Sequence, residues 1–262
     1  MMGSFEIPPP SPGSPSKNPE PALLTVPVDP SLVPEVAELK ERTKNLPETD
    51  GEPLESPWHL AAITLLLDLL TYFWRERQDF FVGGNMFLYY SIHHLLSEDF
   101  KGPDFFVVNG VDRRRPRKSW IVWEENGKYP DLIVEFLSPT IAGKDRTTKK
   151  TLYERTFHTP EYFCFDPETN RLEGWRLQGG AYQDLADDER GWMWSEVLQL
   201  WLGTWTGEYQ GQQATWLRFY DTAGQLIPLR AEAAEAEVTR LKARLAELEA
   251  ERSERKEEGP KS

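Results

Sequence analysis

Cysteine is nearly absent from this 262-residue chain, which contains only Cys164. A single thiol excludes a disulfide framework and a zinc site built from cysteines. It also favours a reducing compartment, so we expect a cytoplasmic protein. Cys164 lies in an apolar, strand-like run, where we expect a buried and unreactive thiol.

Long apolar runs are also missing. The best candidate, residues 60–74, is interrupted by Asp68 and is shorter than the roughly 18 apolar residues that a membrane span needs. The N-terminus lacks the basic region and the apolar core of a secretory signal. We therefore expect no membrane partner.

Basic charge is in short supply. The chain has 30 Lys and Arg against 43 Asp and Glu, a formal net charge of −13, which argues against non-specific coating of nucleic acid. One basic cluster nevertheless stands out, formed by Arg113, Arg114, Arg115, Arg117 and Lys118. It either contacts DNA phosphates or is a solvated loop that balances neighbouring acids.

Composition divides the chain into three parts. Residues 1–50 are predicted to be a disordered tail, because ten of the 21 prolines lie in the first 35 residues and proline lacks the backbone donor of helices and ladders. Residues 56–228 are predicted to form the folded domain, which begins at Ser56-Pro57, a typical helix N-cap and first-turn pair. Residues 230–257 are predicted to form a helix.

The order of elements in the folded part indicates an α/β fold. A long buried helix follows Ser56, and a Gly-Gly pair suggests a β-hairpin near residue 180. Two strands, a helix, and a third strand are predicted between them, at residues 104–108, 131–138, 145–157 and 161–167 respectively. This order predicts a mixed central sheet flanked by helices, with a further helix at the C-terminus.

The C-terminal helix carries an apolar seam with alternating spacings of three and four residues. Its members are Ala231, Ala234, Val238, Leu241, Leu245 and Leu248. Such a pattern is typical of a coiled coil, but it covers fewer than three heptads. It therefore indicates either self-association or a single amphipathic helix.

Glu135 is the most unusual residue of the chain. The strand DLIVEFLS around it is largely apolar on both faces, as in strands buried on both sides of a sheet. A buried carboxylate is costly unless it is paired or binds a metal ion. Glu135 is thus either half of an ion pair, with Lys149 or an arginine, or a metal ligand.

Asp104 is the better second ligand for a metal at Glu135. Asp131 lies on the same strand, but four residues of strand span roughly 13 Å, too far for one ion. Asp104 begins the preceding strand, and an antiparallel pairing would bring it beside Glu135, at roughly 4.8 Å across the ladder. Alternatively, Asp104 simply starts its strand after Gly102-Pro103.

The helix predicted at residues 145–157 supplies a cation. Lys149 lies four residues after Asp145, on the same side of the helix. If the helix packs by Leu152, Tyr153 and Phe157, Lys149 could orient an attacking water or stabilise a pentavalent phosphate. Otherwise it forms a surface pair with Asp145. The four histidines share no ligand spacing and are expected to be structural or exposed; they are His59, His93, His94 and His158.

Three blocks in this region carry a family resemblance. PDLIVEFLSPT, DRTTKKTLY and TPEYFCFDP follow one another in order after the GPDFF strand. This order resembles the Uma-two family of predicted endonucleases, which have the restriction-endonuclease-like PD-(D/E)xK fold. The match covers residues 102–167 closely and 56–185 more loosely, and the C-terminal heptads resemble a common cyanobacterial version of the family.

The resemblance implies a metal-dependent phosphodiesterase site. Asp104 and Glu135 would hold Mg²⁺ or Mn²⁺, with the backbone carbonyl of Phe136 as third ligand, and Asp131 and Asp145 would be secondary candidates. The usual fold motif places a lysine two residues after the acid, but this position is Leu137 here. The family supplies its lysine from the following helix, which corresponds to Lys149.

The leading hypothesis is an endonuclease that hydrolyses phosphodiester bonds of DNA with metal-activated water. The alternative is a catalytically inactive nucleic-acid-binding or scaffold protein on the same fold. The absent standard lysine, the negative charge and the C-terminal heptads favour the alternative. Nucleases of this fold often act as dimers, and a homodimer could form through the core or through the heptads.

Overall fold

The computed structural model describes residues 56–91, 102–137 and 145–257; the side chains of residues 145–146 and 253–257 are not part of this description. The predicted Pro-rich tail, residues 1–50, lies outside it. Within the described part the predicted fold class is confirmed: the chain forms a mixed α/β structure with a mixed central sheet, flanking helices and a C-terminal helix.

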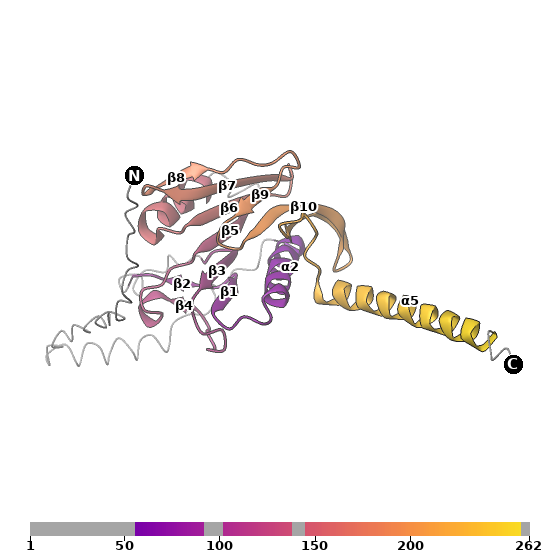
Figure 1. Cartoon of the computed structure of the whole chain (residues 1–262). Coiled ribbons are helices and arrows are strands. Elements are labelled where there is room, and N and C mark those ends of the chain that lie inside the picture. The colour runs from indigo at the N-terminus through magenta and orange to yellow at the C-terminus, as the bar shows by residue number, and fades with distance from the viewer. Residues whose placement is uncertain (1–55, 92–101, 138–144, 258–262) are drawn as a thin grey trace, which may run out of the picture. The chain divides into compact units, whose positions relative to one another are not determined.

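The central sheet has six strands in the order β1-β3-β5-β6-β7-β8 (Figure 1). β5 and β6 pair parallel, and every other neighbouring pair in this sheet is antiparallel. The β7–β8 hairpin turns at the predicted Gly179-Gly180 pair. The strands are β1 (Phe80–Gly84), β3 (Phe105–Asn109), β5 (Leu132–Phe136), β6 (Glu161–Asp166), β7 (Arg171–Gln178) and β8 (Ala181–Asp184).

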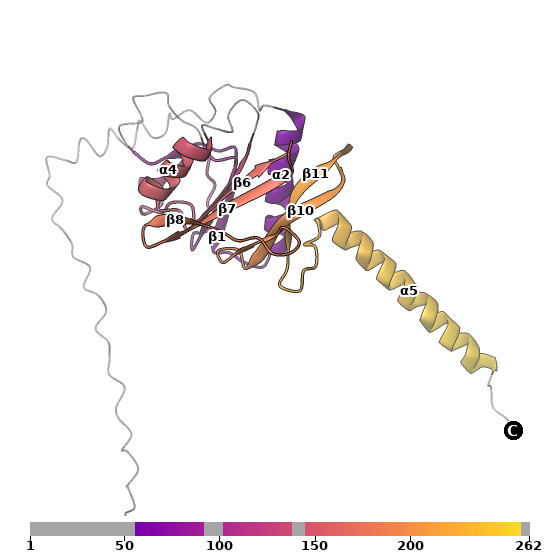
Figure 2. The ribbon, with the colours of Figure 1, turned by 90° about the horizontal axis from the view of Figure 1, so that it is seen from above.

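Helices cover the two faces of this sheet (Figure 2). On one face lies α2 (Pro57–Phe73), which begins as predicted at Ser56, whose side chain accepts a hydrogen bond from the His59 amide at 3.1 Å. On the other face lies a helical segment that starts at Asp145. It consists of η4 (Asp145–Lys149), α4 (Lys150–Leu152) and η5 (Tyr153–Phe157).

This helical segment differs from the single regular helix that the sequence predicts. The bounds agree, but η4 and η5 are π-helical turns around one short α-helical turn. His158 ends the segment in the left-handed conformation, with φ 51°. π-Helical turns are rare in proteins, and those that do occur are often found at functional sites.

β5 is buried on both faces, as its apolar sequence predicts. Val134 and Phe136 belong to the core that includes α2. Ile133 and Leu137 belong to the core beneath the helical segment 145–157. Because side chains alternate along a strand, Glu135 shares this second face.

Two smaller sheets complete the domain. β2 (Leu88–Tyr89) pairs parallel with β4 (Trp120–Ile121), which leads into η3 (Val122–Glu124). The second has the order β11-β10-β9 and packs on α2, where Trp58 stacks on Trp216 with ring centroids 5.6 Å apart. Its strands are β9 (Met193–Ser195), β10 (Leu200–Tyr209) and β11 (Gln212–Tyr220).

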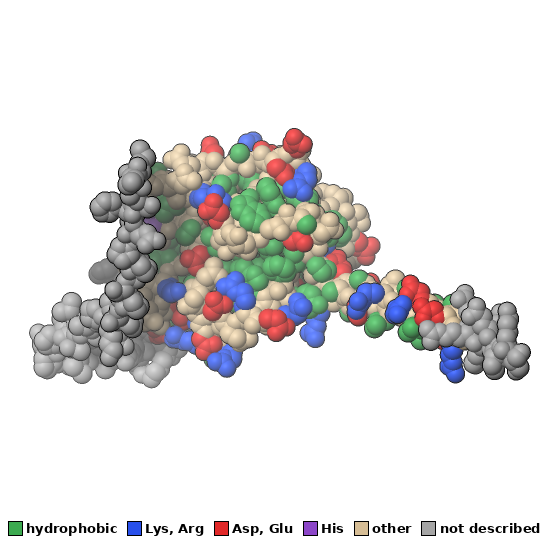
Figure 3. Space-filling model, viewed as in Figure 1, with side chains coloured by type: hydrophobic (Ala, Val, Ile, Leu, Met, Phe, Trp, Pro, Cys, Tyr) green, Lys and Arg blue, Asp and Glu red, His purple; other side chains and the backbone are tan. Residues whose placement is uncertain are grey.

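The C-terminal helix α5 spans Arg230–Glu257, the predicted range. Its first turn is attached to β11, because Glu232 accepts hydrogen bonds at 2.9 and 2.7 Å from the fully buried Arg218. Beyond it, apolar and charged side chains share the exposed surface (Figure 3). Among the helices that the structure describes, none combines the length and apolarity of a membrane span.

Candidate active site

Asp104 and Glu135 lie on neighbouring strands. β3 and β5 pair antiparallel with Phe105 opposite Val134, so continuing this register by one residue places Asp104 opposite Glu135. A direct hydrogen bond at 2.7 Å from the Phe136 amide to Asp104 Oδ2 ties the two strand ends together. This is the juxtaposition that the sequence predicts.

Asp104 is held as an anion between a helix and a strand. Its Oδ1 lies 3.0 Å from His59 Nε2, near the start of α2. Burial raises the pKa of Asp104, but the hydrogen bond and charge of His59, the charge of Lys149 and the Phe136 amide outweigh it. The net pKa therefore lies below the usual value, and the carboxylate is ionised at neutral pH.

Glu135 is fully buried and doubly hydrogen-bonded. Its exposed fraction is 0%, and Lys149 Nζ donates to Oε2 at 2.7 Å. The Tyr153 hydroxyl donates to Oε1, also at 2.7 Å. Lys149 keeps 19% of its side chain exposed, so it connects the buried carboxylate to solvent. Pairing of this kind offsets the cost of burying a charge.

The site thus combines residues from both layers around the sheet. His59 comes from α2 on one face, whereas Lys149 and Tyr153 come from the helical segment on the other. All of them meet at the end of the sheet where β3 begins and β5 ends. The segments next to this end in sequence, residues 92–101 and 138–144, lie outside the described part of the chain.

Tyr153→Phe tests how much the hydroxyl contributes to holding Glu135. Removing it leaves Oε1 of a buried carboxylate without its described donor, while ring packing is kept. We expect a loss of about 1–2 kcal/mol in the free energy of unfolding, measured by urea titration. Tyr129→Phe, a tyrosine in the same core, is the control and should change stability less; equal losses would contradict the assignment.

The donor set fits a hard divalent cation. No group of three or more His, Cys, Asp or Glu within residues 56–91, 102–137 and 145–257 is arranged to hold a metal ion. Mg²⁺, however, is commonly bound by one or two carboxylates plus water and phosphate oxygens. Each carboxylate oxygen has two lone pairs, so an oxygen that accepts a hydrogen bond can also bind a cation.

Of the two secondary candidates, Asp131 lies away from this site. Asp131 lies at the opposite end of β5, where its Oδ2 accepts a hydrogen bond from the Asn109 amide at 2.6 Å. Burial raises the pKa of Asp131, against the lowering effects of this amide and of Lys128. Its position therefore indicates a structural role. Asp145 begins η4, but its side chain lies outside the description.

The basic cluster lies away from the site. It follows the far end of β3, and the five residues of this strand span about 16 Å. Arg117 is only 3% exposed and donates to Glu125 at 2.8 and 3.0 Å. This placement supports the loop interpretation over phosphate binding for Arg117.

The other arginines of the cluster also have partners within the chain. Arg113 donates to backbone carbonyls at the end of α2, at 3.2–3.4 Å. Arg114 pairs with Asp112 at 3.5 Å, and Arg115 pairs with Glu124 and Glu125 at 3.4 and 3.1 Å. The Arg114 side chain is 79% exposed, against 45% for Arg115. Phosphate binding by Arg114 and by Lys118 stays a prediction.

Two residues of the site escaped the sequence analysis. His59 was expected to be structural or exposed, and Tyr153 was expected only to pack. Neither has a sequence spacing to Asp104 or Glu135 that could reveal the contact. For Tyr153 the one available signal is its position four residues after Lys149, on the same side of the helical segment.

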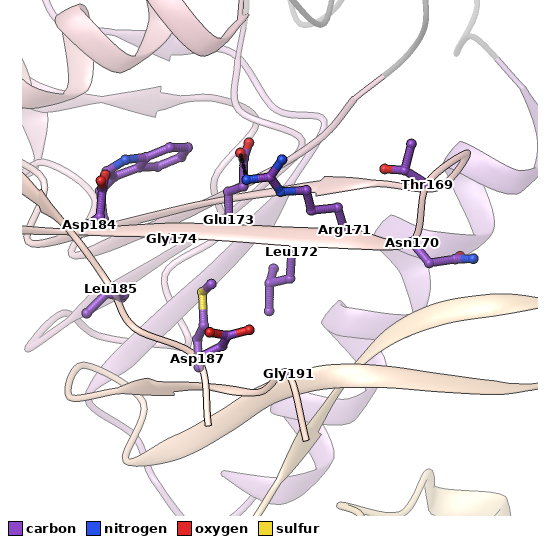
Figure 4. A pocket seen from close by; sticks show the side chains of 12 residues that line it. Thr169, Asn170, Arg171, Leu172, Glu173, Gly174, Asp184, Leu185, Asp187 and Gly191 are labelled. Atoms are coloured by element: carbon purple, nitrogen blue, oxygen red, sulfur yellow. Dashed lines mark ion pairs between the residues drawn. The ribbon is translucent and has the colours of Figure 1, made fainter. Parts of the chain in front are cut away.

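A separate cavity of about 630 Å³ lies along β7 and the segment that follows β8 (Figure 4). Glu173, Asp184 and Asp187 contribute acidic groups to its wall, and Arg171 pairs with Glu173 at 3.1 Å. Neither Asp104, Glu135 nor Lys149 lines it. The cavity is therefore distinct from the candidate site.

Comparison with known proteins identifies the family. Residues 26–206 match the family model Uma2, described as "Putative restriction endonuclease", and the chain belongs to this family. No curated protein matches the chain. A similar solved structure is a "putative nuclease belonging to DUF820" from Anabaena variabilis. The two are 18% identical with a TM-score of 0.42, over 61% of this chain and 89% of the other.

Proposed function

We propose that the protein is a metal-dependent endonuclease that hydrolyses phosphodiester bonds of DNA. Membership of a restriction endonuclease family supports a nuclease-type function. The observation that carries the proposal is the convergence of Asp104, Glu135 and Lys149 at one end of the central sheet. The cytoplasm is proposed as its compartment, supported by the single cysteine.

The residues divide the chemistry between them. Asp104 and Glu135 would hold Mg²⁺ or Mn²⁺, with the Phe136 carbonyl as a third ligand. The ion, when bound, neutralises charge on the scissile phosphate and makes water more acidic. Lys149 holds protons at Nζ, where it can orient the attacking water or stabilise the phosphate oxygens. His59 keeps Asp104 ionised and in place.

One observation supports the alternative function, a catalytically inactive nucleic-acid-binding or scaffold protein. Glu135 has no exposed surface, and its two oxygens accept hydrogen bonds from Lys149 and Tyr153. The same contacts would stabilise the fold without any reaction. An experiment must therefore remove the charge of Glu135 while keeping the size and shape of its side chain.

Glu135→Gln makes this separation, because the amide keeps the size of the side chain and removes its charge. Purified wild type and variant are incubated with plasmid DNA, single-stranded DNA and RNA, in Mg²⁺, Mn²⁺ or EDTA. We expect metal-dependent cleavage of DNA by the wild type and its loss in Glu135→Gln. Glu173→Gln, a carboxylate of β7 outside the site, should cleave like wild type.

Circular dichroism establishes that each variant is folded. Cleavage in EDTA, or equal cleavage by wild type and a folded Glu135→Gln, would overturn the assignment of the site. Binding of DNA by the wild type without cleavage under any metal would instead support the alternative. Cleavage of RNA alone would overturn the proposed substrate and leave the site intact.

A further inference from the structure

An apolar stripe runs along the exposed surface of α5. Val238, Leu241, Leu245 and Leu248 are between 45% and 58% exposed, although this helix is otherwise rich in charged residues. Exposed apolar side chains in a continuous row are unusual on a charged helix and are typical of an interaction surface. In the single chain this stripe is an apolar surface that no other described element covers.

The stripe continues to the start of the helix as a regular a/d pattern. Ala231, Val238 and Leu245 occupy the a positions. Ala234, Leu241 and Leu248 occupy the d positions. In the middle of this pattern, the β-branched Val238 at an a position and Leu241 at a d position are compatible with a coiled coil of two helices. Because Glu232 is held by the buried Arg218, the first turn stays attached to the domain while the stripe beyond it is exposed.

The charges beside the stripe alternate in sign from one heptad to the next. The g positions are Arg230, Glu237 and Arg244, and the e positions are Glu235, Lys242 and Glu249. In a parallel coiled coil, each g residue faces the e residue five positions later on the other strand. For two copies of this helix in register, each of these three pairs combines opposite charges.

The same alternation disfavours a shifted pairing. If one copy slips by a heptad, Arg230 faces the partner's Lys242 and Glu237 faces the partner's Glu249, which are like charges. An antiparallel pairing with full overlap is also attractive, since Glu235 then faces the partner's Lys242. The pattern is therefore complementary to itself at full overlap, as expected for a surface that binds a second copy of the same chain.

We propose that α5 forms a two-stranded coiled coil with α5 of a second copy, through residues 231–248. In the single chain, Glu237 contacts Arg240 at 2.7 Å and Arg244 contacts Glu247 at 2.9 Å. These pairs are exposed and weak, so they can rearrange at little cost when the copies meet. The seam is short, so the affinity is modest and falls with added salt.

The mass of the full-length protein in solution tests the assembly. Sedimentation equilibrium over a range of concentrations should give twice the chain mass for the wild type. Leu241→Lys, in the middle of the stripe, should give the mass of one chain. Ala243→Lys, on the opposite side of the same helix, should behave like wild type. A wild-type mass of one chain at all concentrations, or a dimer that survives Leu241→Lys, would overturn the proposal.

Charge reversal tests the register. Lys242→Glu creates like-charge contacts and should weaken the dimer about tenfold. Adding Glu237→Lys should restore it in a parallel pair, and adding Glu235→Lys should restore it in an antiparallel pair. Restoration by neither second change would overturn the proposed pairing. None of these readouts depends on cleavage, so the result is independent of the proposed nuclease activity.

Discussion

Lys149→Met is expected to lower the rate of metal-dependent DNA cleavage by about 100- to 1,000-fold, the usual cost of removing one donor aimed at a transition state. The variant keeps the length of the aliphatic side chain and removes the ammonium that donates to Glu135. The measurement is the initial rate of plasmid cleavage at saturating metal. This prediction rests on the proposed function.

Lys150→Met is the matched control. Lys150 is the next residue in the chain, but its Nζ lies over the Trp175 ring, 4.0 Å from the centroid. Both variants lose one positive charge from the same segment, so a general weakening of DNA binding should affect them similarly. Equal rates in the two variants would contradict a specific role of Lys149 in the reaction.

The pairing of the two acidic residues was accessible from the sequence for a physical reason. Strand periodicity places Glu135 within a run that is apolar on both faces, and this already marks its burial. The preceding strand starts at Asp104, and an antiparallel connection brings the start of one strand to the end of the other. Local pattern and topology therefore suffice for this contact.

The contacts made by the helices were not accessible in the same way. His59 lies 45 positions before Asp104 in sequence, and its contact depends on how α2 packs across the sheet. The hydrogen bond between Tyr153 and Glu135 depends on the direction in which Tyr153 leaves the helical segment 145–157. The period of a regular α-helix does not predict that direction, because part of the segment is π-helical. Packing between layers, rather than local pattern, determines both.

The basic cluster shows the limit of reading charge from the sequence alone. Its five basic residues look like a binding patch, yet Arg117 is buried against Glu125, which lies eight residues later. Sequence spacing shows that acids are nearby but not that a side chain points inward. For Asp131, by contrast, strand geometry already predicts a position too far from Glu135 to share one ion, and its contact with the Asn109 amide lies at that far end of β5.

Glu161→Gln is expected to lower the free energy of unfolding more than Tyr153→Phe or Glu196→Gln does. Glu161 is 1% exposed and accepts hydrogen bonds from Arg176 Nε and Nη2 at 3.0 and 2.8 Å. It also accepts from the Ser195 hydroxyl and from the Glu196 amide at 2.9 Å. The carboxylate thus ties β6 and β7 of the central sheet to the end of β9 in the three-stranded sheet.

The glutamine amide would leave Arg176 without its buried counter-charge and would point a donor at other donors. We expect a loss of about 3–5 kcal/mol in the free energy of unfolding, the usual cost of breaking a buried pair. For a domain of this size this corresponds to a drop of roughly 10 °C in the melting temperature.

Glu196→Gln is the control that separates the effect of burial from the effect of charge on stability. Glu196 pairs with the same arginine at 2.9 Å, but its side chain is 63% exposed. Water screens this second pair, so its loss should cost less than about 1 kcal/mol. Thermal unfolding of both variants is followed by circular dichroism. Similar melting temperatures for the two variants would mean that losing either negative charge beside Arg176 has the same effect. That result would refute the link between the sheets through the buried Glu161.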